Sequence, residues 1–291
     1  MRVVHTQVFA ANPGGGNPCP VVTDAAALSD TAMLGLARRF GLDTVFILPA
    51  QRGGSIRMRY FVPDHEMGVS GHATIAGVSV AVGGRSSVGR ILVETITGDF
   101  DVTVIDGEHD PLVTLEQLPP TFGKLADPTD VARVLNIEPS DVVTDRGPVQ
   151  SVSVSRPKLI VPLKDWRILN SLKPDYDALW CLCESTGVTG IYPFTRQTNK
   201  LHADVEARQF PLRAGFLEDA ATGVAAGALG GYFAKYDTDC APGQYYVQVA
   251  QGYAMGAPSS IQVIVENRDG TTIRTAVQGS ARVVTEEEIA I

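Results

Sequence analysis

The sequence predicts a mixed α/β (α+β) fold of two similar halves, each a curled β-sheet wrapped around a central apolar helix. The segments "ATIAGVSVAVGG" (73–84) and "ATGVAAGALGGYF" (221–233) are apolar on nearly every side, which is typical of a helix buried all round. No segment holds about 18 consecutive apolar residues, so we expect strands rather than lipid to cover these helices.

Similar sequence segments precede the two apolar helices. The segment "RYFVPDHEMGVSGHAT" (59–74) matches "RQFPLRAGFLEDAATG" (208–223) at several positions, and the two lie about half a chain apart. A repeat of this length indicates a duplicated α/β unit rather than a solenoid, whose repeats are much shorter. If the halves face each other, the N-termini of both central helices can point into one cleft.

The first half alternates strands and helices in a readable order. Ser29 should cap a helix over 30–41, whose apolar residues recur at helical spacing. The hairpin over 91–107 should turn at Gly98-Asp99. The other expected elements are strands at 2–10, 19–24, 44–50 and 55–63, and the central helix at 72–84.

A Pro-rich stretch at 115–130 precedes the same order in the second half. A helix over 127–136 has Asp127 or Thr129 as its cap, and a second helix covers 174–186. The remaining expected elements are strand-like segments at 151–163, 187–196 and 203–211, the central helix at 220–236, and strands at 245–252, 259–267 and 275–289.

The composition excludes several classes of partner. A formal net charge of −8, without runs of Lys or Arg, argues against nucleic acids and anionic membranes. The first residues lack the apolar core and cleavage site of a signal peptide. A low cysteine count suggests a reducing compartment, so we expect a cytoplasmic protein.

The cysteines and histidines do not form a metal-binding pattern. Cys181 and Cys183 have C-x-C spacing, but no second pair or nearby His completes a site. We interpret these two as buried structural thiols. The five histidines contain no H-x-x-x-H pair, so we predict no metal.

The starts of the two central helices carry the candidate chemistry. The backbone N–H groups of a helix N-terminus attract an anion, here a small substrate carboxylate. His72 and Asp219 would lie at the edge of such a site, where a neutral imidazole and an ionised carboxylate can accept a proton. Alternatively, Asp219 is only the N-cap of a helix that begins at Ala220 or Ala221.

Other chemistries lack their motifs. The glycine-rich turn that ends in Asn17 has neither the lysine of a P-loop nor the spacing of a dinucleotide site, and we expect it to line the cleft. No G-x-S-x-G elbow indicates a serine hydrolase. Nothing in the sequence marks a desolvated lysine for a Schiff base.

Six segments together carry a resemblance to the PhzF family of phenazine-biosynthesis isomerase-like proteins. They are "VFAANPGGGNPCPVV", "RRFGLDTVFILP", "RYFVPDHEMGVSGHATIAG", "VETITGDFDVTV", "ARQFPLRAGFLEDAATGVAAG" and "QGYAMGAPSSIQV". The resemblance runs nearly end to end, and the pair "GHAT" and "EDxATG" at this separation is specific. It implies the diaminopimelate epimerase-like fold, with two pseudo-symmetric halves, an active site between them, and neither a metal nor an organic cofactor. We place the first half at 1–118 plus 276–291 and the second at 119–275.

The resemblance also implies the site residues. The family's catalytic acid lies three residues before a strand-entry Phe, which places it at Asp43, and the other acid–base positions map onto His72 and Asp219. Gly71 maps onto backbone that binds the substrate carboxylate. Further binding residues are expected at the helix starts and in the glycine-rich turn: Ser70, Ala220, Thr222, Gly223 and Asn17.

Three positions depart from the family pattern. Asp43 stands where the family has Glu, so its carboxylate is set back by about an ångström. Val224 replaces a Ser, and Ala257 replaces an Arg. These changes suggest a specialised and less polar substrate. The related racemases use two cysteines, whose places here are Ser70 and Asp219, so a two-cysteine racemisation is not expected.

The expected activity is that of a cofactor-independent isomerase. It would shift a proton and a double bond in a small unsaturated carboxylated metabolite of antibiotic or phenazine-type biosynthesis, such as an alkyl-proline precursor. An amino-acid epimerase that uses Asp43 and Asp219, or a non-catalytic metabolite-binding protein, remains as an alternative. A homodimer is expected from the resemblance alone.

Overall fold

The computed structural model describes residues 1–83, 89–237, 243–268 and 271–290. The chain forms two compact units, Met1–Leu115 with Gln278–Ile291, and Glu116–Val277. It passes between them within β8 (Leu112–Gln117) and again within β17 (Thr271–Gly279).

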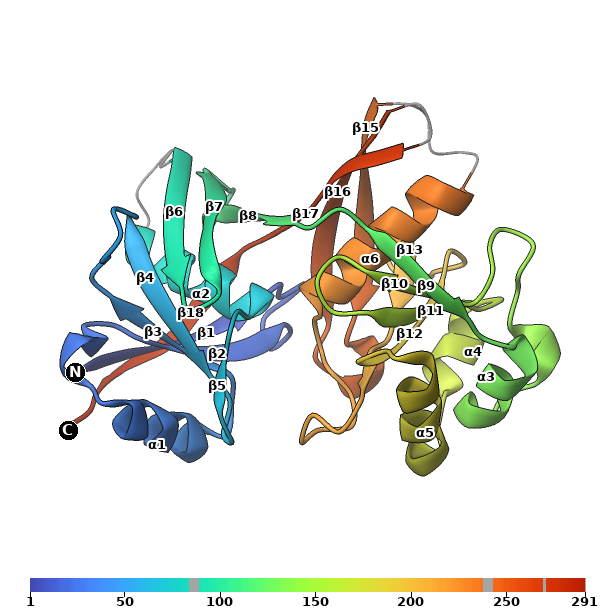
Figure 1. Ribbon diagram of the computed structural model, residues 1–291, viewed down its shortest axis with the longest axis horizontal. Helices are drawn as coiled ribbons and strands as arrows, with labels where there is room; N and C mark the ends of the chain where they lie inside the picture. The colour runs from blue at the N-terminus through green and yellow to red at the C-terminus, as the bar shows by residue number, and fades with distance from the viewer. Residues whose placement is uncertain (84–88, 238–242, 269–270, 291) are drawn as a thin grey trace. The chain divides into compact units, whose positions relative to one another are not determined.

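In the first unit, strands surround the central helix α2 (Gly71–Val82), as Figure 1 shows. The strands are β1 (Arg2–Val8), β2 (Asn17–Val22), β3 (Thr44–Leu48), β4 (Ile56–Phe61), β5 (Glu66–Met67), β6 (Gly89–Thr95), β7 (Gly98–Ile105) and β18 (Ala281–Glu288). β1 pairs antiparallel with both β2 and β18, and this pairing brings the two chain ends together. A short 3-10 turn (Ala25–Ala27) leads to α1 (Asp30–Phe40), which packs on the outer side. Ser29 caps α1 as expected, since its Oγ accepts a hydrogen bond from the Ala32 N–H.

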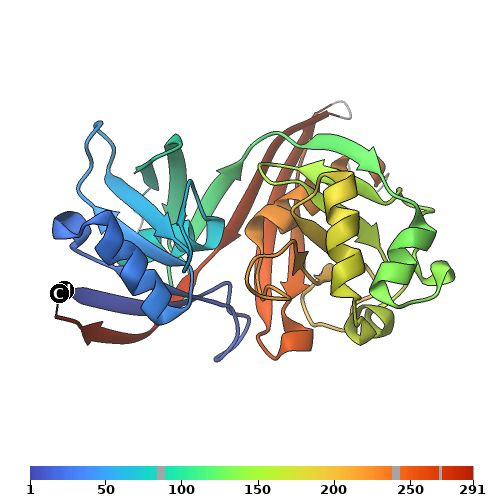
Figure 2. The same ribbon diagram turned by 60° about the horizontal axis from the view of Figure 1, so that its bottom comes forward.

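The second unit repeats this arrangement around α6 (Gly223–Tyr236). Its strands are β9 (Thr121–Leu125), β10 (Gln150–Ser153), β11 (Lys158–Pro162), β12 (Gly190–Thr195), β13 (Val205–Ala207), β14 (Phe210–Pro211), β15 (Gly243–Gln251) and β16 (Ser259–Arg268). The other helices are α3 (Pro128–Leu135), α4 (Trp166–Ser171) and α5 (Tyr176–Thr186), with short 3-10 turns at Pro139–Asp141 and Tyr253–Met255. Figure 2 shows α3 and α5 side by side on the outer face, where they cover an apolar cluster that includes Leu159 and Val161.

Small residues let the strands close around the central helices. Residues 73–79 of α2 and 225–234 of α6 are buried. A Cβ on Gly77 would come within 2.8 Å of the Met58 side chain, and one on Gly230 within 2.7 Å of Val263. Both helices are therefore apolar because each is enclosed by a sheet, which confirms the predicted fold class.

Several predicted boundaries were wrong. The β6–β7 hairpin turns at Ile96-Thr97, because Thr95 already pairs with Gly98, and Gly98 begins the second strand with a φ of 132°. The Pro-rich stretch contains β9 as well as the end of β8, and its two adjacent prolines fall between the strands. Strand 151–163 is two antiparallel strands, β10 and β11. The helix α4 was missed. Of the two candidate caps for α3, Asp127 holds the position.

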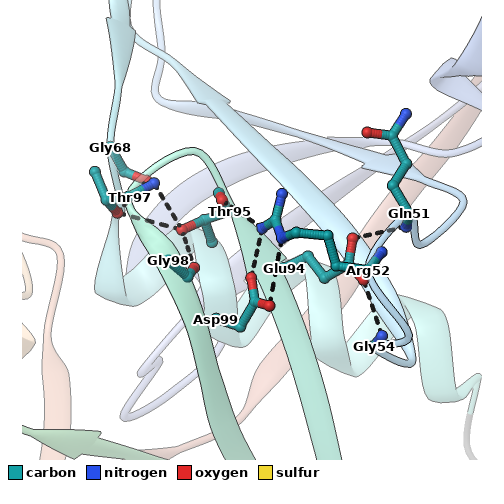
Figure 3. A network of polar contacts seen from close by, with 9 residues as sticks. All are labelled: Gln51, Arg52, Gly54, Gly68, Glu94, Thr95, Thr97, Gly98 and Asp99. Carbon is teal, nitrogen blue, oxygen red and sulfur yellow. Dashed lines mark hydrogen bonds and ion pairs between the residues drawn. The ribbon is translucent and has the colours of Figure 1, made fainter.

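A buried carboxylate holds the loop between β3 and β4 against the β6–β7 hairpin (Figure 3). Glu94 is fully buried and accepts hydrogen bonds from the backbone N–H groups of Gln51, Arg52 and Gly54, at 2.6 to 2.8 Å. Burial raises the pKa of Glu94, but these donors and the Arg52 guanidinium outweigh it and hold the pKa below its usual value. Arg52 also binds Asp99 and the Thr95 carbonyl of the hairpin.

The same hairpin contacts the segment that leads into α2. Thr97 Oγ1 donates a 3.4 Å hydrogen bond to the Gly68 carbonyl, two residues before Ser70. A Cβ on Gly68 would meet the Thr97 methyl at 2.5 Å, so only glycine permits this approach. The network in Figure 3 thus helps to fix the start of α2. Among the described residues, no helix is long and apolar enough to cross a membrane.

Candidate active site

His72 and Asp43 face each other in the first unit. The distance from His72 Nε2 to Asp43 Oδ2 is 3.7 Å, and the side chains are 13% and 23% exposed. This separation is too long for a hydrogen bond. His72 Nε2 is buried and has no hydrogen-bond partner among the described residues. Since a buried polar atom without a partner costs free energy, a ligand atom that bonds to Nε2 would recover that cost.

The start of α2 holds the His72 ring in place. Ser70 Oγ lies 3.3 Å from His72 Nδ1. If the hydroxyl donates this bond, Nε2 carries the proton and directs it toward Asp43. The Ser70 carbonyl accepts a 2.8 Å bond from Thr74 Oγ1, which is itself bonded to the buried Tyr60 hydroxyl at 2.8 Å. The ring is thus supported by a short chain of buried hydroxyl groups.

The first turn of α2 offers backbone donors beside this pair. Ser70 occupies the N-cap position, but its side chain accepts no hydrogen bond from the helix. The N–H groups near Gly71 are therefore not satisfied by this cap, and Gly71 is half-buried. Such a helix start can bind a carboxylate next to His72.

Asp43 lies at the entrance of two parallel strands. β2 and β3 pair in parallel with Val21 opposite Val45, which places Asp43 level with Cys19. Burial, together with the charge of Asp43, raises the pKa of Cys19 well above its ordinary value, so this cysteine remains a neutral thiol. Asn17 begins β2 two residues earlier, at the same end of the strand pair.

The N-cap interpretation of Asp219 was wrong. α6 begins at Gly223 with Thr222 as its N-cap, and the Thr222 side chain forms no cap bond to the helix. Instead, Thr222 Oγ1 donates a 2.6 Å hydrogen bond to Asp219 Oδ2. Ala220 and Ala221, which were expected to begin the helix, are buried in the turn between Asp219 and the cap. Asp219 is therefore held ahead of the helix, one short turn before its N-terminus.

A buried glutamine fixes this turn from behind. Gln251 Nε2 donates to the Asp219 carbonyl at 2.8 Å and to Thr222 Oγ1 at 3.1 Å, and Gln251 is fully buried. Gln251 Oε1 accepts a 2.9 Å bond from Tyr192, also fully buried. Sequence reasoning missed Gln251. The only signal is an amide at the end of an alternating strand, which does not by itself reveal a partner.

The two carboxylates before α6 are held differently. Glu218 forms a two-pronged ion pair with Arg208, at 2.7 and 2.8 Å, and both side chains are about nine-tenths buried. The first unit has the same pair, Arg59 with Glu66, at 2.7 Å in both bonds. In each unit the arginine also lies over the phenylalanine two residues later. The repeated letters thus encode a structural clamp, and Glu218 belongs to that clamp.

The structure also shows a buried lysine, although the sequence marked none. Lys158 begins β11 and is 5% exposed. Burial, and secondarily the charge of Arg156, lowers its pKa from 10.5 to about 8, while Asp219 and Cys183 act in the opposite direction. The available signal was a single charge at the head of the apolar run "KLIVP".

The expected site residues fall into two groups by unit. Asp43, Ser70, Gly71 and His72 lie together at the start of α2. The second group surrounds the start of α6, and its members are Asp219, Ala220, Thr222 and Gly223. A separate cavity of about 440 Å³ in the second unit contains none of these residues. Its lining includes Phe194, Tyr232 and Phe233.

The cysteine interpretation was partly wrong. Cys19 and Cys183 are buried, but Cys181 is exposed, because α5 turns it away from the apolar face that holds Cys183. Within the described ranges, no group of three or more His, Cys, Asp or Glu side chains is arranged to hold a metal ion.

Known proteins resemble this chain over its full length. The sequence profile of the family described as "Phenazine biosynthesis-like protein" (PhzC-PhzF) matches residues 6–287. An uncharacterized isomerase, YddE of Escherichia coli K12, is 30% identical over 297 residues, which cover 100% of this chain and 98% of that protein. The trans-2,3-dihydro-3-hydroxyanthranilate isomerase of Pseudomonas aeruginosa is 28% identical over 282 residues, 96% of this chain and 95% of that protein.

A solved structure agrees with these matches. The crystal structure of a PhzF-family phenazine biosynthesis protein from Bacillus anthracis superposes with a TM-score of 0.90 and 26% identity. The superposition covers 100% of this chain and 99% of that one. The resemblance read from the sequence is therefore confirmed, as is the fold that it implied.

Proposed function

Because this chain belongs to the phenazine biosynthesis-like (PhzC-PhzF) family and is an isomerase, we propose that it moves a proton between two carbons of a small unsaturated carboxylic acid. The observation that carries the proposal is the pair of Asp43 and His72, at 3.7 Å, with a buried Nε2 at a helix start that has no hydrogen-bond partner among the residues the structure describes. These are the groups required for acid–base chemistry beside a bound carboxylate.

Asp43 is the proposed acid–base group. Its carboxylate removes a proton from one carbon, the electron pair moves along the unsaturated system, and the same proton or a solvent proton adds at another carbon. The double bond shifts and the atoms of the substrate are conserved, so no cofactor is consumed. His72 and Asp219 position or relay protons in this reaction.

The candidate donors for the substrate carboxylate are the backbone N–H groups near Gly71 and those at the start of α6. Both helix starts have N-cap residues that form no side-chain bond to the helix. Ser70, Ala220, Thr222 and Gly223 shape these starts, and Asn17 contributes an amide. Specificity for an anion then follows from the backbone rather than from a basic side chain.

The first substrate to test is trans-2,3-dihydro-3-hydroxyanthranilate, which is named in the activity of the Pseudomonas aeruginosa relative. Val224 and Ala257, which lack the polar groups usual in the family, favour a less polar substrate as the second choice. An unsaturated proline precursor with an alkyl tail fits that description. Either compound belongs to antibiotic or phenazine-type metabolism. We also propose that the protein is cytoplasmic and forms a homodimer. Light scattering of the purified protein would test the homodimer.

Proton NMR in D₂O tests the reaction directly. We expect a shifted double bond with deuterium at the new carbon for the wild type, and none for Asp43→Asn. Asp64→Asn, an exposed acid of the same unit, is the matched control and should behave as wild type. Full turnover by Asp43→Asn would refute the role of Asp43. Inversion at an α-carbon without a bond shift would instead identify an epimerase.

A further inference from the structure

Lys158 is buried in the second unit although nothing in the proposed reaction uses it. It begins β11 and is 5% exposed. Burial of an ammonium group is costly unless a negative charge lies nearby. A lysine at such a position therefore raises the question of which anion compensates it.

The strand pattern shows which side of the sheet Lys158 faces. Leu159 and Val161 belong to the apolar cluster covered by α3 and α5. Side chains alternate along a strand, so Lys158 and Ile160 face the opposite side, toward α6. Ile160 pairs in parallel with Tyr192 of β12, whose hydroxyl bonds to Gln251 behind Asp219.

The register carries Lys158 toward Asp219. Since Ile160 is opposite Tyr192, Lys158 is level with Gly190. The position of a Cβ on Gly190 would be 2.3 Å from Gln209 Nε2, so the Gln209 side chain lies directly over this glycine. The Gln209 backbone carbonyl in turn accepts a 3.0 Å hydrogen bond from the Asp219 N–H. Lys158 and Gln209 thus lie in one buried layer, and the Gln209 backbone joins this layer to half-buried Asp219.

This layer is short of polar partners. Gln209 is 1% exposed, and neither atom of its amide has a hydrogen-bond partner among the described residues. The charged or titratable groups that act on Lys158 are Arg156, Asp219 and Cys183. Burial raises the pKa of Cys183 to about 12, so this thiol is neutral at physiological pH. Asp219 is therefore the anion that offsets the charge of Lys158.

We propose that Lys158 is a positioning residue for Asp219. The buried ammonium charge of Lys158 keeps the Asp219 carboxylate ionised and ready to accept a proton in the resting enzyme. The inference rests on the proposed function of Asp219, but the charge coupling can be measured without turnover. Lys158 acts through Asp219 and need not touch the substrate. It is charged at neutral pH and loses its charge above about pH 8.

The first experiment is an NMR titration of protein labelled with ¹³C at the lysine ε-carbons. The Lys158 resonance is the one missing from Lys158→Met. We expect Asp219→Asn to lower the titration midpoint of Lys158 by about half a unit or more, because it removes the anion that offsets the Lys158 charge. Glu184→Gln, which removes an acid next to Cys183 on α5, is the control and should leave the midpoint unchanged. An unchanged midpoint in Asp219→Asn would overturn the proposal.

The second experiment uses the pH profile of kcat/KM. Lys158→Met should move the acid limb of the profile to higher pH by about one pH unit. At a given pH on that limb, kcat/KM then falls about tenfold. Lys158→Arg should keep the wild-type acid limb, and Lys235→Met, at the far end of α6, should match wild type throughout. Unchanged acid limbs in all variants would refute the proposal. If wild type turns over neither candidate substrate, the proposed reaction fails, and the titration still decides the coupling.

Discussion

Oδ2 of Asp43 lies 3.7 Å from Nε2 of His72. Asp43 immediately precedes β3, and His72 is the second residue of α2. One more methylene in the acidic side chain would cover most of the distance by which these two atoms exceed hydrogen-bond length. The resemblance to the family implies a Glu at this position, and we infer that the shorter Asp side chain leaves the gap. Asp43 thus leaves space beside His72 that a Glu side chain would occupy.

Asp43→Glu should close this gap. We expect the variant to isomerise trans-2,3-dihydro-3-hydroxyanthranilate at least about tenfold faster than wild type, since an ångström of misplacement is costly to proton transfer. Initial rates from NMR give the comparison. Loss of activity toward an alkyl-proline precursor in the same variant would show that the space beside His72 accommodates that substrate. A slower reaction with both compounds would contradict this account of the gap.

The adjacent acids Glu218 and Asp219 should differ in their effect on activity. Glu218→Gln leaves Arg208 in a buried position with a weakened partner, so the free energy of unfolding should fall by about 3 kcal/mol. Its kcat should stay within about threefold of wild type. Asp219→Asn should instead reduce kcat/KM by roughly 100-fold, because the proposed reaction uses this carboxylate. Thermal melts and kinetics of both variants test this, and the opposite assignment would make Glu218 the catalytic acid.

Gln251 should be essential to the start of α6. Gln251→Leu removes the bonds to Tyr192, Thr222 and the Asp219 carbonyl, and leaves buried groups unsatisfied. We expect a loss of about 2 to 4 kcal/mol in unfolding free energy, together with reduced activity. Gln248→Leu is the control. Gln248 lies on the same strand, and its side-chain nitrogen donates a hydrogen bond to half-buried Ser260. This change should cost less than about 1 kcal/mol of unfolding free energy. Equal losses from urea titration would argue against a special role of Gln251.

Lys158 predicts an unusual dependence of stability on pH. Its folded pKa of about 8 lies below the ordinary 10.5, so between these values the unfolded chain binds more protons than the folded one. Stability should therefore rise with pH across this window, by up to about 3 kcal/mol from this group. Lys158→Met should lack this contribution, and the difference between the two urea-denaturation profiles isolates it. A constant difference from pH 8 to 10.5 would show that Lys158 titrates normally.

Local patterns identified most of the fold. The apolar helices 72–84 and 220–236 were predictable because small residues on every side require enclosure, and the sheets close over Gly77 and Gly230 at distances that exclude larger side chains. Ser29 and Asp127 were predictable as caps because capping depends on neighbours in the chain. The start of α6 was not, because its turn is bonded to Gln251 of a distant strand, through the Asp219 carbonyl and Thr222 Oγ1.

Periodicity and short motifs were sufficient to establish the duplicated α/β architecture, the family, and the residues at the two helix starts. The contacts of each polar residue were established by the folded structure alone. It assigned Glu218 to the clamp with Arg208, and it left His72 Nε2 buried with no hydrogen-bond partner in the described part of the chain. It also placed Lys158 in the layer behind Asp219. Burial and charge pairing depend on residues that are distant in the chain, and for this reason no local pattern encodes them.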